Sequence, residues 1–325
     1  MIKRRYIDYS FHFLSIAKGF GSVVLIACLL FLYGCIDNFD ISGVEAEVKI
    51  VIEGRIENGK YAEVFVLRSN PLSSTDTSDY YKNAFVIDAK VFVSDGTTTE
   101  QLKFRPVSSS VTEEDSSYVY YFPYLGTQIK GVPGKSYSLT VIADGKTYTA
   151  ITTIPTPVAL DSVWWKAQAP YDTLGYAWAH LSEPAGVGNN YKWYAKRTNK
   201  WYAPGTPSEK KDRRYLAPLG STFDDKFVDG QSFDFFFNRG LDASDTLTQV
   251  DKSGLNIYFK KTDMIFIKFC TIDQVAAKFF TTYEAASQSN GNPFASPVSI
   301  MSNIQGGGLG SWIGFGCTYD TIVPK

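Results

Sequence analysis

Histidine is the side chain that most often carries acid–base chemistry near neutral pH, and the chain contains only two, His12 and His180. His180 ends the segment Ala177–His180, whose pattern predicts a β-strand. Because His12 lies in an N-terminal segment with the features of an export signal, a Ser-His-Asp relay would have to use His180. The sequence contains no G-x-S-x-G and no H-E-x-x-H motif. A lone strand histidine without these motifs favours a structural role, and we expect no catalytic residue.

Three acidic residues, Asp224, Asp225 and Asp229, stand close together and carry the oxygen ligands that calcium prefers. Their spacing is not that of an EF-hand, because no glutamate follows at the twelfth position. A solvated turn between two phenylalanine-bearing strands explains the same residues without an ion. Cys270 and Cys317 cannot build a four-ligand zinc site without further histidines. We therefore expect no metal site and no cofactor.

Aromatic residues suggest where a ligand could bind. Trp201 and Tyr202 stand beside a charged, proline-containing loop, where aromatic rings can stack on a sugar or fill a groove of a partner. We take these two as candidate ligand-binding residues, for a glycan, a peptide or another nutrient. Tyr191, Trp193 and Ala195 alternate along a predicted strand, and the alternative for these three is that they face the core.

The N-terminal segment decides where the chain is located. An uncharged apolar run, Gly19–Cys35, follows four cationic residues, Lys3, Arg4, Arg5 and Lys18, which is the charge pattern of an export signal. The run ends in Leu32-Tyr33-Gly34-Cys35, which resembles the bacterial lipobox, in which the cysteine is lipidated and becomes the new N-terminus. Tyr33 departs from that pattern, since a small residue is usual there.

We predict that residues 1–34 form a lipoprotein signal peptide, that Cys35 is the lipid attachment site and that residues 35–45 form a tether. The alternative is an uncleaved signal anchor, since the apolar run reaches roughly the lower length limit of a membrane span.

Export changes both the charge and the redox setting of the chain. Of the 32 Lys+Arg and 33 Asp+Glu, four basic residues and one acidic residue lie in residues 1–34, so 28 and 32 remain. This mild acidic balance gives no electrostatic footprint for nucleic acid. Cys270 and Cys317 would lie in an oxidising compartment, where a disulfide is permitted. Their spacing does not fix the pairing, so a disulfide and two separate buried thiols both stay open.

Short alternating apolar segments separated by glycine turns fill the chain after the tether and predict a mostly β fold. Asn58-Gly59 and Asp144-Gly145 are two-residue hairpin signals. We expect residues 46–155 to form an immunoglobulin-like antiparallel β-sandwich. The sequence Ile154-Pro155-Thr156-Pro157 marks a domain boundary, because proline does not continue a central strand. Residues 156–325 are then expected to form a second β-rich domain.

One amphipathic helix is predicted in that second domain, near residues 272–286. Thr271 and Gln274 fit a capping box at its start. Apolar residues at helical spacing form one stripe, made of Ile272, Val275, Ala276, Phe279 and Tyr283. We expect the helix to cover a sheet and to bury this stripe.

Several short motifs follow one another in order along nearly the whole mature chain. They are Val51–Ile56, Val132–Tyr137, Ala143–Gly145, Leu160–Val163, Glu183–Tyr191, Asp224–Gly230, Asn292–Phe294, Ser302–Ile304 and Gly306–Gly310. Taken in order, these segments resemble the DUF4249 family of Bacteroidetes lipoproteins. Glu183 stands where an aspartate is more usual, and Trp312 interrupts the closing glycine-aromatic segment. The function of the family is unknown, but its members are commonly encoded beside TonB-dependent outer-membrane receptors. The resemblance implies a place at the outer membrane and a role in nutrient uptake.

We therefore expect a non-catalytic outer-membrane lipoprotein that is an accessory ligand-binding or docking component of a TonB-dependent nutrient uptake system. Its expected partners are the membrane, through the lipid, and the receptor. The alternatives are a surface hydrolase that uses His180 or the acid pair Asp224 and Asp225, and a structural or adhesive cell-surface module. The sequence leaves open whether the chain faces the periplasm or the cell exterior.

The lipid anchor is tested by replacing Cys35 with alanine. We expect the wild-type chain to incorporate radiolabelled palmitate and to sediment with membranes, because two or more acyl chains anchor a protein stably. The Cys35→Ala variant is expected to lose both properties, whereas Cys28→Ala, a cysteine of the same apolar run, is expected to keep them. If Cys35→Ala stays uncleaved in the membrane fraction, the segment is a signal anchor.

Overall fold

The fold is mostly β, as the sequence predicts. The computed structural model describes residues 47–69, 84–105, 107–108, 120–121, 123–198, 212, 214–241, 255–289, 296 and 298–325. Among these residues one α-helix is present, α4 (Gln274–Ser289), together with one short 3₁₀ helix, η1 (Leu255–Ile257). No helix in this part of the chain is long and apolar enough to cross a membrane.

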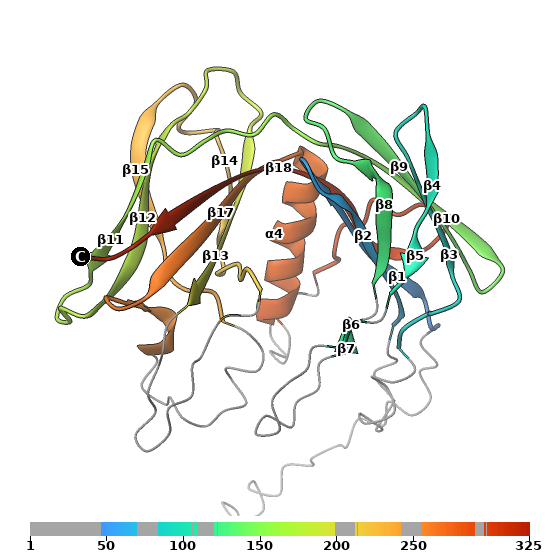
Figure 1. Cartoon of the computed structure of the whole chain (residues 1–325), viewed down its shortest axis with the longest axis horizontal. Helices are drawn as coiled ribbons and strands as arrows, with labels where there is room; N and C mark the ends of the chain where they lie inside the picture. The colour runs from blue at the N-terminus through green and yellow to red at the C-terminus, as the bar shows by residue number, and fades with distance from the viewer. Residues whose placement is uncertain are drawn as a thin grey trace, which may run out of the picture. The chain divides into compact units, whose positions relative to one another are not determined.

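The largest element is an eight-stranded sheet with the order β14-β13-β17-β18-β1-β2-β8-β5 (Figure 1). Its strands from the N-terminal half are β1 (Ile50–Glu57), β2 (Tyr61–Arg68), β5 (Lys103–Phe104) and β8 (Tyr124–Lys130). Those from the C-terminal half are β13 (Asn190–Thr198), β14 (Thr222–Asp224), β17 (Met264–Ile272) and β18 (Leu309–Ile322). Neighbouring strands are antiparallel except β1 and β18, which run parallel.

Strand β18 joins the two halves of the chain. Its first part pairs with β1, from Leu309 to Phe315, and its second part pairs with β17, from Gly316 to Ile322. The predicted division into two domains at Ile154–Pro157 is not confirmed, because Glu47–Lys325 forms one compact unit and the large sheet crosses that boundary. Periodicity shows which residues form strands, but it does not show which strands pair.

A second sheet, with the order β10-β9-β3-β4, shares a hydrophobic core with the N-terminal strands of the large sheet. It consists of β3 (Lys90–Ser94), β4 (Thr99–Gln101), β9 (Ser136–Ala143) and β10 (Lys146–Thr153), all antiparallel. Ile52 of β1 and Leu139 of β9 are both buried in this core. The two sheets enclose one core, and the end of the chain also contributes to it. Trp312 of β18 is buried in the same core, and its Nε1 donates a hydrogen bond to the carbonyl of Tyr137, at 2.9 Å.

Both predicted hairpins are present in this part of the fold. Asn58-Gly59 connects β1 to β2, and Asp144-Gly145 connects β9 to β10. Asp144 and Gly145 have φ of 50° and 74°. Positive φ at both central residues is the type I′ turn, whose twist matches that of the flanking strands. A further short pair, β6 (Val107–Ser108) with β7 (Tyr120–Tyr121), is also antiparallel.

A third sheet packs against the C-terminal strands of the large sheet. Its order is β11-β12-β15, with β11 (Ser162–Ala167), β12 (Leu174–Ser182) and β15 (Ser232–Phe237), and the short strand β16 (Phe259–Lys260) also pairs with β12 (Figure 1). Ala179 and Leu181 from this sheet share a core with Trp193 and Phe269 from the large sheet. Tyr191, Trp193 and Ala195 all belong to this core, so the alternative that they face the interior is confirmed.

Helix α4 covers a third hydrophobic cluster on the large sheet, close to the predicted position. Its N-cap differs from the prediction: Asp273 Oδ1 accepts a hydrogen bond from the backbone N–H of Ala276 at 2.7 Å, while Thr271 belongs to β17. Asp273 therefore satisfies one of the free N–H groups of the first turn. Glu284 fixes the middle of the helix, because its carboxylate pairs with Lys192 of β13 at 2.8 Å.

The predicted buried stripe of the helix is only partly correct. Ala276 and Ala277 are buried, and Phe279 and Phe280 pack against the same cluster. Val275 and Tyr283, however, are 50% and 52% exposed. The contact face is therefore turned toward the small alanines, which let the helix lie close to the sheet.

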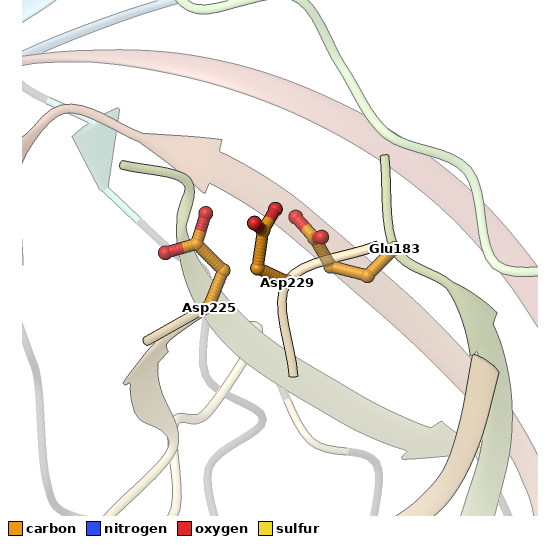
Figure 2. Close-up of side chains that lie close together, drawn as sticks. All are labelled: Glu183, Asp225 and Asp229. Atoms are coloured by element: carbon orange, nitrogen blue, oxygen red, sulfur yellow. The ribbon is translucent and has the colours of Figure 1, made fainter. Parts of the chain in front are cut away.

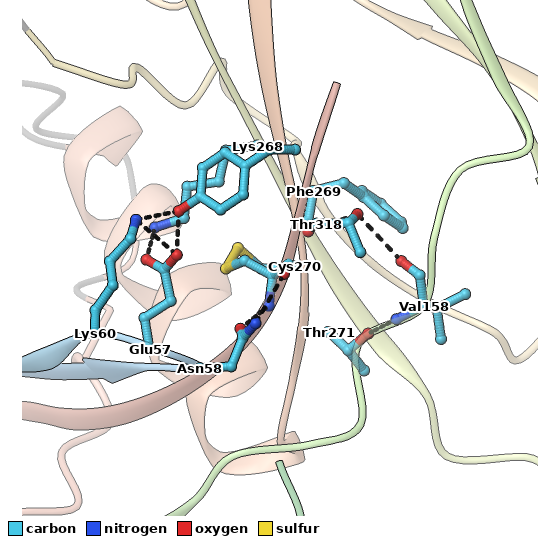
Figure 3. Close-up of a disulfide and its surroundings, with 11 residues drawn as sticks. Glu57, Asn58, Lys60, Val158, Lys268, Phe269, Cys270, Thr271 and Thr318 are labelled. Atoms are coloured by element: carbon cyan, nitrogen blue, oxygen red, sulfur yellow. Dashed lines mark hydrogen bonds and ion pairs between the residues drawn. A yellow bond between two sulfur atoms is a disulfide. The ribbon is translucent and has the colours of Figure 1, made fainter. Parts of the chain in front are cut away.

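Cys270 and Cys317 form a disulfide between β17 and β18, beneath α4 (Figure 3). The two residues lie directly opposite each other in the antiparallel ladder, with a Cα–Cα distance of 4.0 Å. Of the two alternatives that the sequence leaves open, the structure contains the paired one. Asn58, next to β1, adds a second link, because its side-chain amide donates to the carbonyl of Cys317 at 3.2 Å and its Oδ1 accepts from the N–H of Cys317 at 2.6 Å.

A buried ionic network stands beside this disulfide (Figure 3). Glu57 of β1 accepts a hydrogen bond from Lys268 Nζ of β17 at 2.6 Å, pairs with Lys60 at 2.8 Å and contacts the hydroxyl of Tyr319 of β18. Burial alone would raise the pKa of Glu57, but the charge of Lys268 and the hydrogen bonds from its neighbours hold that pKa below its usual value. Burial lowers the pKa of Lys268, and the attraction of Glu57 opposes this. The network connects three strands that are distant in the sequence.

Breaking the disulfide is expected to destabilise the fold. Reduction, or the double variant Cys270→Ala/Cys317→Ala, should lower the free energy of unfolding by about 2–4 kcal/mol, because the bond lowers the conformational entropy of the unfolded chain. Urea unfolding of oxidised and reduced wild-type protein measures this without creating a cavity, and thiol titration of the unfolded chain counts free cysteines. Equal unfolding midpoints in both forms would contradict the expectation.

Candidate functional site

The sheet β11-β12-β15 has a buried inner face, and its outer face carries half-buried and exposed residues. In β12 the buried residues are Gly175, Ala177, Ala179 and Leu181, of which the last three are 0% exposed, and the residues between them point outward. Successive side chains of a strand point to opposite faces, so alternate residues of β11 and β15 share each face as well. We call the outward residues of the three strands, together with the neighbouring Tyr258, the aromatic face. The outward residues are Ser162, Trp164, Lys166, Tyr176, Trp178, His180, Ser182, Ser232, Asp234 and Phe236.

A row of three aromatic rings crosses this face. Trp164 lies opposite Trp178, and Trp178 lies opposite Phe236. The ring centroids are 6.0 Å and 4.7 Å apart, respectively. Phe236 is 46% exposed, although it is one of the largest apolar side chains. Large aromatic rings on the open side of a sheet do not stabilise a core, so this row requires another explanation.

A second group of rings continues the row toward β16. Tyr176 stacks on Phe236 with a centroid distance of 4.9 Å, and Tyr258 lies 5.2 Å from Tyr176. A hydrogen bond with Tyr258 raises the pKa of Tyr176. Lys166 Nζ lies 5.0 Å from the ring centroid of Trp178, within the range of a cation–π contact.

Polar side chains border the rings on the other side. His180 Nδ1 and Asp234 Oδ1 are 2.6 Å apart, and the hydroxyls of Ser182 and Ser232 are 3.0 Å apart. Ser162 lies opposite His180 on β11, so a serine, a histidine and an aspartate stand in one row across the sheet. The bond to Asp234 orients the imidazole. Relay chemistry would also need donors aimed at a developing oxyanion.

A separate acidic cluster lies at the end of the sheet (Figure 2). It consists of Glu183, Asp225 and Asp229, with one carboxylate oxygen of each within 4.8 Å of the others. Two of the three aspartates singled out in the sequence belong to it, and the third, Asp224, is exposed on β14. The third member of the cluster is Glu183 rather than Asp224. Spacing in the sequence could not show this, because Glu183 comes from a different loop.

The carboxylates of this cluster hold two loops together. Asp225 Oδ2 accepts hydrogen bonds from the backbone N–H groups of Gly188 and Asn189, both at 2.8 Å. Glu183 Oε2 accepts from the N–H of Gly230 at 2.7 Å. Asp229 Oδ1 accepts from the N–H of Gly186 at 2.7 Å.

Each acid of the cluster is therefore engaged by at least one backbone donor. Three carboxylates are a set that can bind a hard cation. The predicted turn explains their backbone hydrogen bonds without an ion.

Glu183 also affects a residue in the adjacent core. Its Oε1 accepts a hydrogen bond from the hydroxyl of Tyr191 at 3.0 Å, and from Asn189 Nδ2 at 2.7 Å. Burial, and then the hydrogen bond to the Glu183 carboxylate, raise the pKa of Tyr191. The acidic cluster thus fixes the first residues of β13 to the core.

Other residues predicted from the sequence are not described by the structure. The proposed ligand-binding pair Trp201 and Tyr202 and the lipid attachment site Cys35 lie outside the described residues. The aromatic face was missed, although a signal was present: in Tyr176–His180, large residues alternate with alanine. In an alternating strand the large apolar residues usually face the core, but in β12 the alanines face the core and the large residues face outward.

The sequence comparison now assigns the family. Residues 36–317 match the family described as "Domain of unknown function (DUF4249)". The chain is a member of the DUF4249 family. This confirms the resemblance seen in the sequence, and the match covers both halves of the large sheet. A search of curated proteins gives no match.

The structural role of the acidic cluster in this DUF4249 protein is tested at Asp225. Asp225→Ala is expected to lower the free energy of unfolding by about 2 kcal/mol, because two backbone N–H groups lose their acceptor. The neighbouring Asp224→Ala, at an exposed position, is the matched control and should change stability by less than about 0.5 kcal/mol. Both are measured by urea unfolding. A rise in the melting temperature of the wild type on adding calcium would instead show that the carboxylates bind an ion.

Proposed function

We propose that the mature chain is a non-catalytic outer-membrane lipoprotein, anchored through Cys35, that acts as an accessory ligand-binding component of a TonB-dependent nutrient uptake system. The aromatic face is the surface through which it binds its ligand. This face is the single observation that carries the binding part of the proposal.

Export is supported by two independent features. The cationic and apolar N-terminal segment ends in a lipobox-like sequence with Cys35. The disulfide between Cys270 and Cys317 is of a kind that persists in oxidising compartments and is rare in the cytosol. A protein that reaches such a compartment with an N-terminal lipid remains attached to a membrane.

A binding role is supported by the composition of the aromatic face. Tryptophan, tyrosine and phenylalanine are enriched at binding surfaces, because they bury a large area and lose little conformational entropy. The Trp164–Trp178–Phe236 row offers such area on an outward-facing surface. Ordered polar pairs next to the row, such as His180 with Asp234, can fix the orientation of a bound molecule.

The connection to uptake is supported by family membership. The DUF4249 family itself is defined without a function. The sequence motifs associate this chain with lipoproteins that are commonly encoded beside TonB-dependent receptors, and an exported binding protein fits that setting.

Capture from membranes tests the proposal. The full-length protein with a tag after Lys325 is purified from detergent-solubilised outer membranes of the native host. We expect a TonB-dependent receptor to be recovered with it, as identified by mass spectrometry. An unrelated outer-membrane lipoprotein with the same tag is the control, and it should not recover that receptor. Recovery of the tagged lipoprotein alone would contradict the proposal.

A further inference from the structure

The aromatic face combines two kinds of chemistry within one surface. The Trp164–Trp178–Phe236 row is apolar, and the rows on either side of it carry hydrogen-bonding groups. On one side stand His180, Asp234 and serine hydroxyls, and on the other Lys166 and two tyrosine hydroxyls. A ligand that lies across this surface must therefore present apolar area in its middle and polar groups at its borders.

The charge on this surface is close to zero. Lys166 and Asp234 are the basic and the acidic residue of the aromatic face, and their formal charges are of opposite sign. An anionic partner such as nucleic acid or an acidic lipid surface needs clustered cations, which these strands do not supply. The charge balance thus favours an uncharged ligand.

A saccharide chain has both required properties and no net charge. The C–H groups on one side of a sugar ring are apolar and pack on an aromatic ring, while its hydroxyls both donate and accept hydrogen bonds. Asp234 accepts such bonds, Lys166 donates them, and the serine hydroxyls do both. Fatty acyl chains offer these polar groups no hydrogen bonds and would remove them from water, at a cost in binding free energy.

The dimensions of the row fit more than one sugar ring. Trp164 and Phe236 stand on strands separated by β12, so the row spans on the order of 10 Å. Among the residues that the structure describes, β11 and β15 are the two edges of this sheet, and no further strand pairs with the outer side of either. A ligand can contact a ring at each end of the row.

We propose that the aromatic face binds a neutral oligosaccharide or polysaccharide chain that lies across β11, β12 and β15. This inference rests on the proposed function, and it names the class of ligand for the same surface. Trp164 and Phe236 contact the sugar rings, and Asp234 and His180 bind hydroxyl groups.

Affinity electrophoresis tests the inference. The purified mature protein is run in native gels that contain soluble neutral polysaccharides, one per gel: starch, dextran, laminarin, xylan or galactomannan. We expect at least one of them to slow the wild type relative to a gel without polysaccharide. The variants Phe236→Ala and Trp164→Ala should each weaken the affinity about tenfold, because each removes one aromatic contact. Asp234→Asn should weaken it less.

The matched control is Phe227→Ala. Phe227 is 82% exposed and lies in a turn outside the aromatic face, so its removal should leave the retardation unchanged. Circular dichroism and urea unfolding of each variant show whether the fold is kept. Phe236→Ala is the more informative variant, because that side chain is nearly half exposed and its loss disturbs the sheet least.

Three outcomes overturn the inference. The wild type is retarded by none of the polysaccharides, or it is retarded equally after Phe236→Ala and Trp164→Ala. In the third outcome, these variants lose the TonB-dependent receptor in the capture experiment while no polysaccharide binds, which makes the aromatic face a protein-docking surface. The proposed function fails separately, if no receptor is recovered with the wild type, and saccharide binding can still be present in that case.

Discussion

The C-terminal strand β18 lies between β17 and β1, and the eight-stranded sheet is continuous only because this strand is in place. Parallel pairs such as β1–β18 are slightly less stable per residue than antiparallel ones, and this pair connects opposite ends of the chain. Other interactions reinforce the same seam. Glu57 reaches Lys268 and Tyr319, Asn58 bonds the backbone of Cys317, and the disulfide joins Cys317 to Cys270. These polar and covalent links thus hold β18 and connect its two neighbours, β1 and β17.

The same seam indirectly positions the aromatic face. Strand β17 pairs with β18 on one side and with β13 on the other, so Phe269 and Trp193 are held in a fixed plane. Their large rings pack in the core beneath the third sheet, opposite the small residues Ala177 and Ala179 of β12. The large residues Tyr176 and Trp178 of β12 occupy the outer face. The row of rings thus lies on the side of the third sheet that faces away from this core.

Local features of the fold were predictable from the sequence, and non-local features were not. The hairpin at Asp144-Gly145 and the helix after β17 follow from residue type and spacing over a few positions. The pairing of Val51 with Leu309 does not, since alternation is the same whichever strand is the neighbour. The aromatic face was missed for a related reason: whether Trp178 points inward depends on residues of another sheet. In the acidic cluster, Asp225 was identified but its partner Glu183 was not, because the two come from separate loops.

The central position of β18 has a consequence for the biogenesis of the protein. Synthesis of a polypeptide reaches the C-terminus last. Until then β1 and β17 both have an unpaired edge, and such edges pair readily with other chains. Non-local pairing of this kind is also slow to form. A chain that lacks its last residues therefore keeps these edges unpaired and stays open to proteases. Only a chain that includes β18 can thus form the continuous eight-stranded sheet.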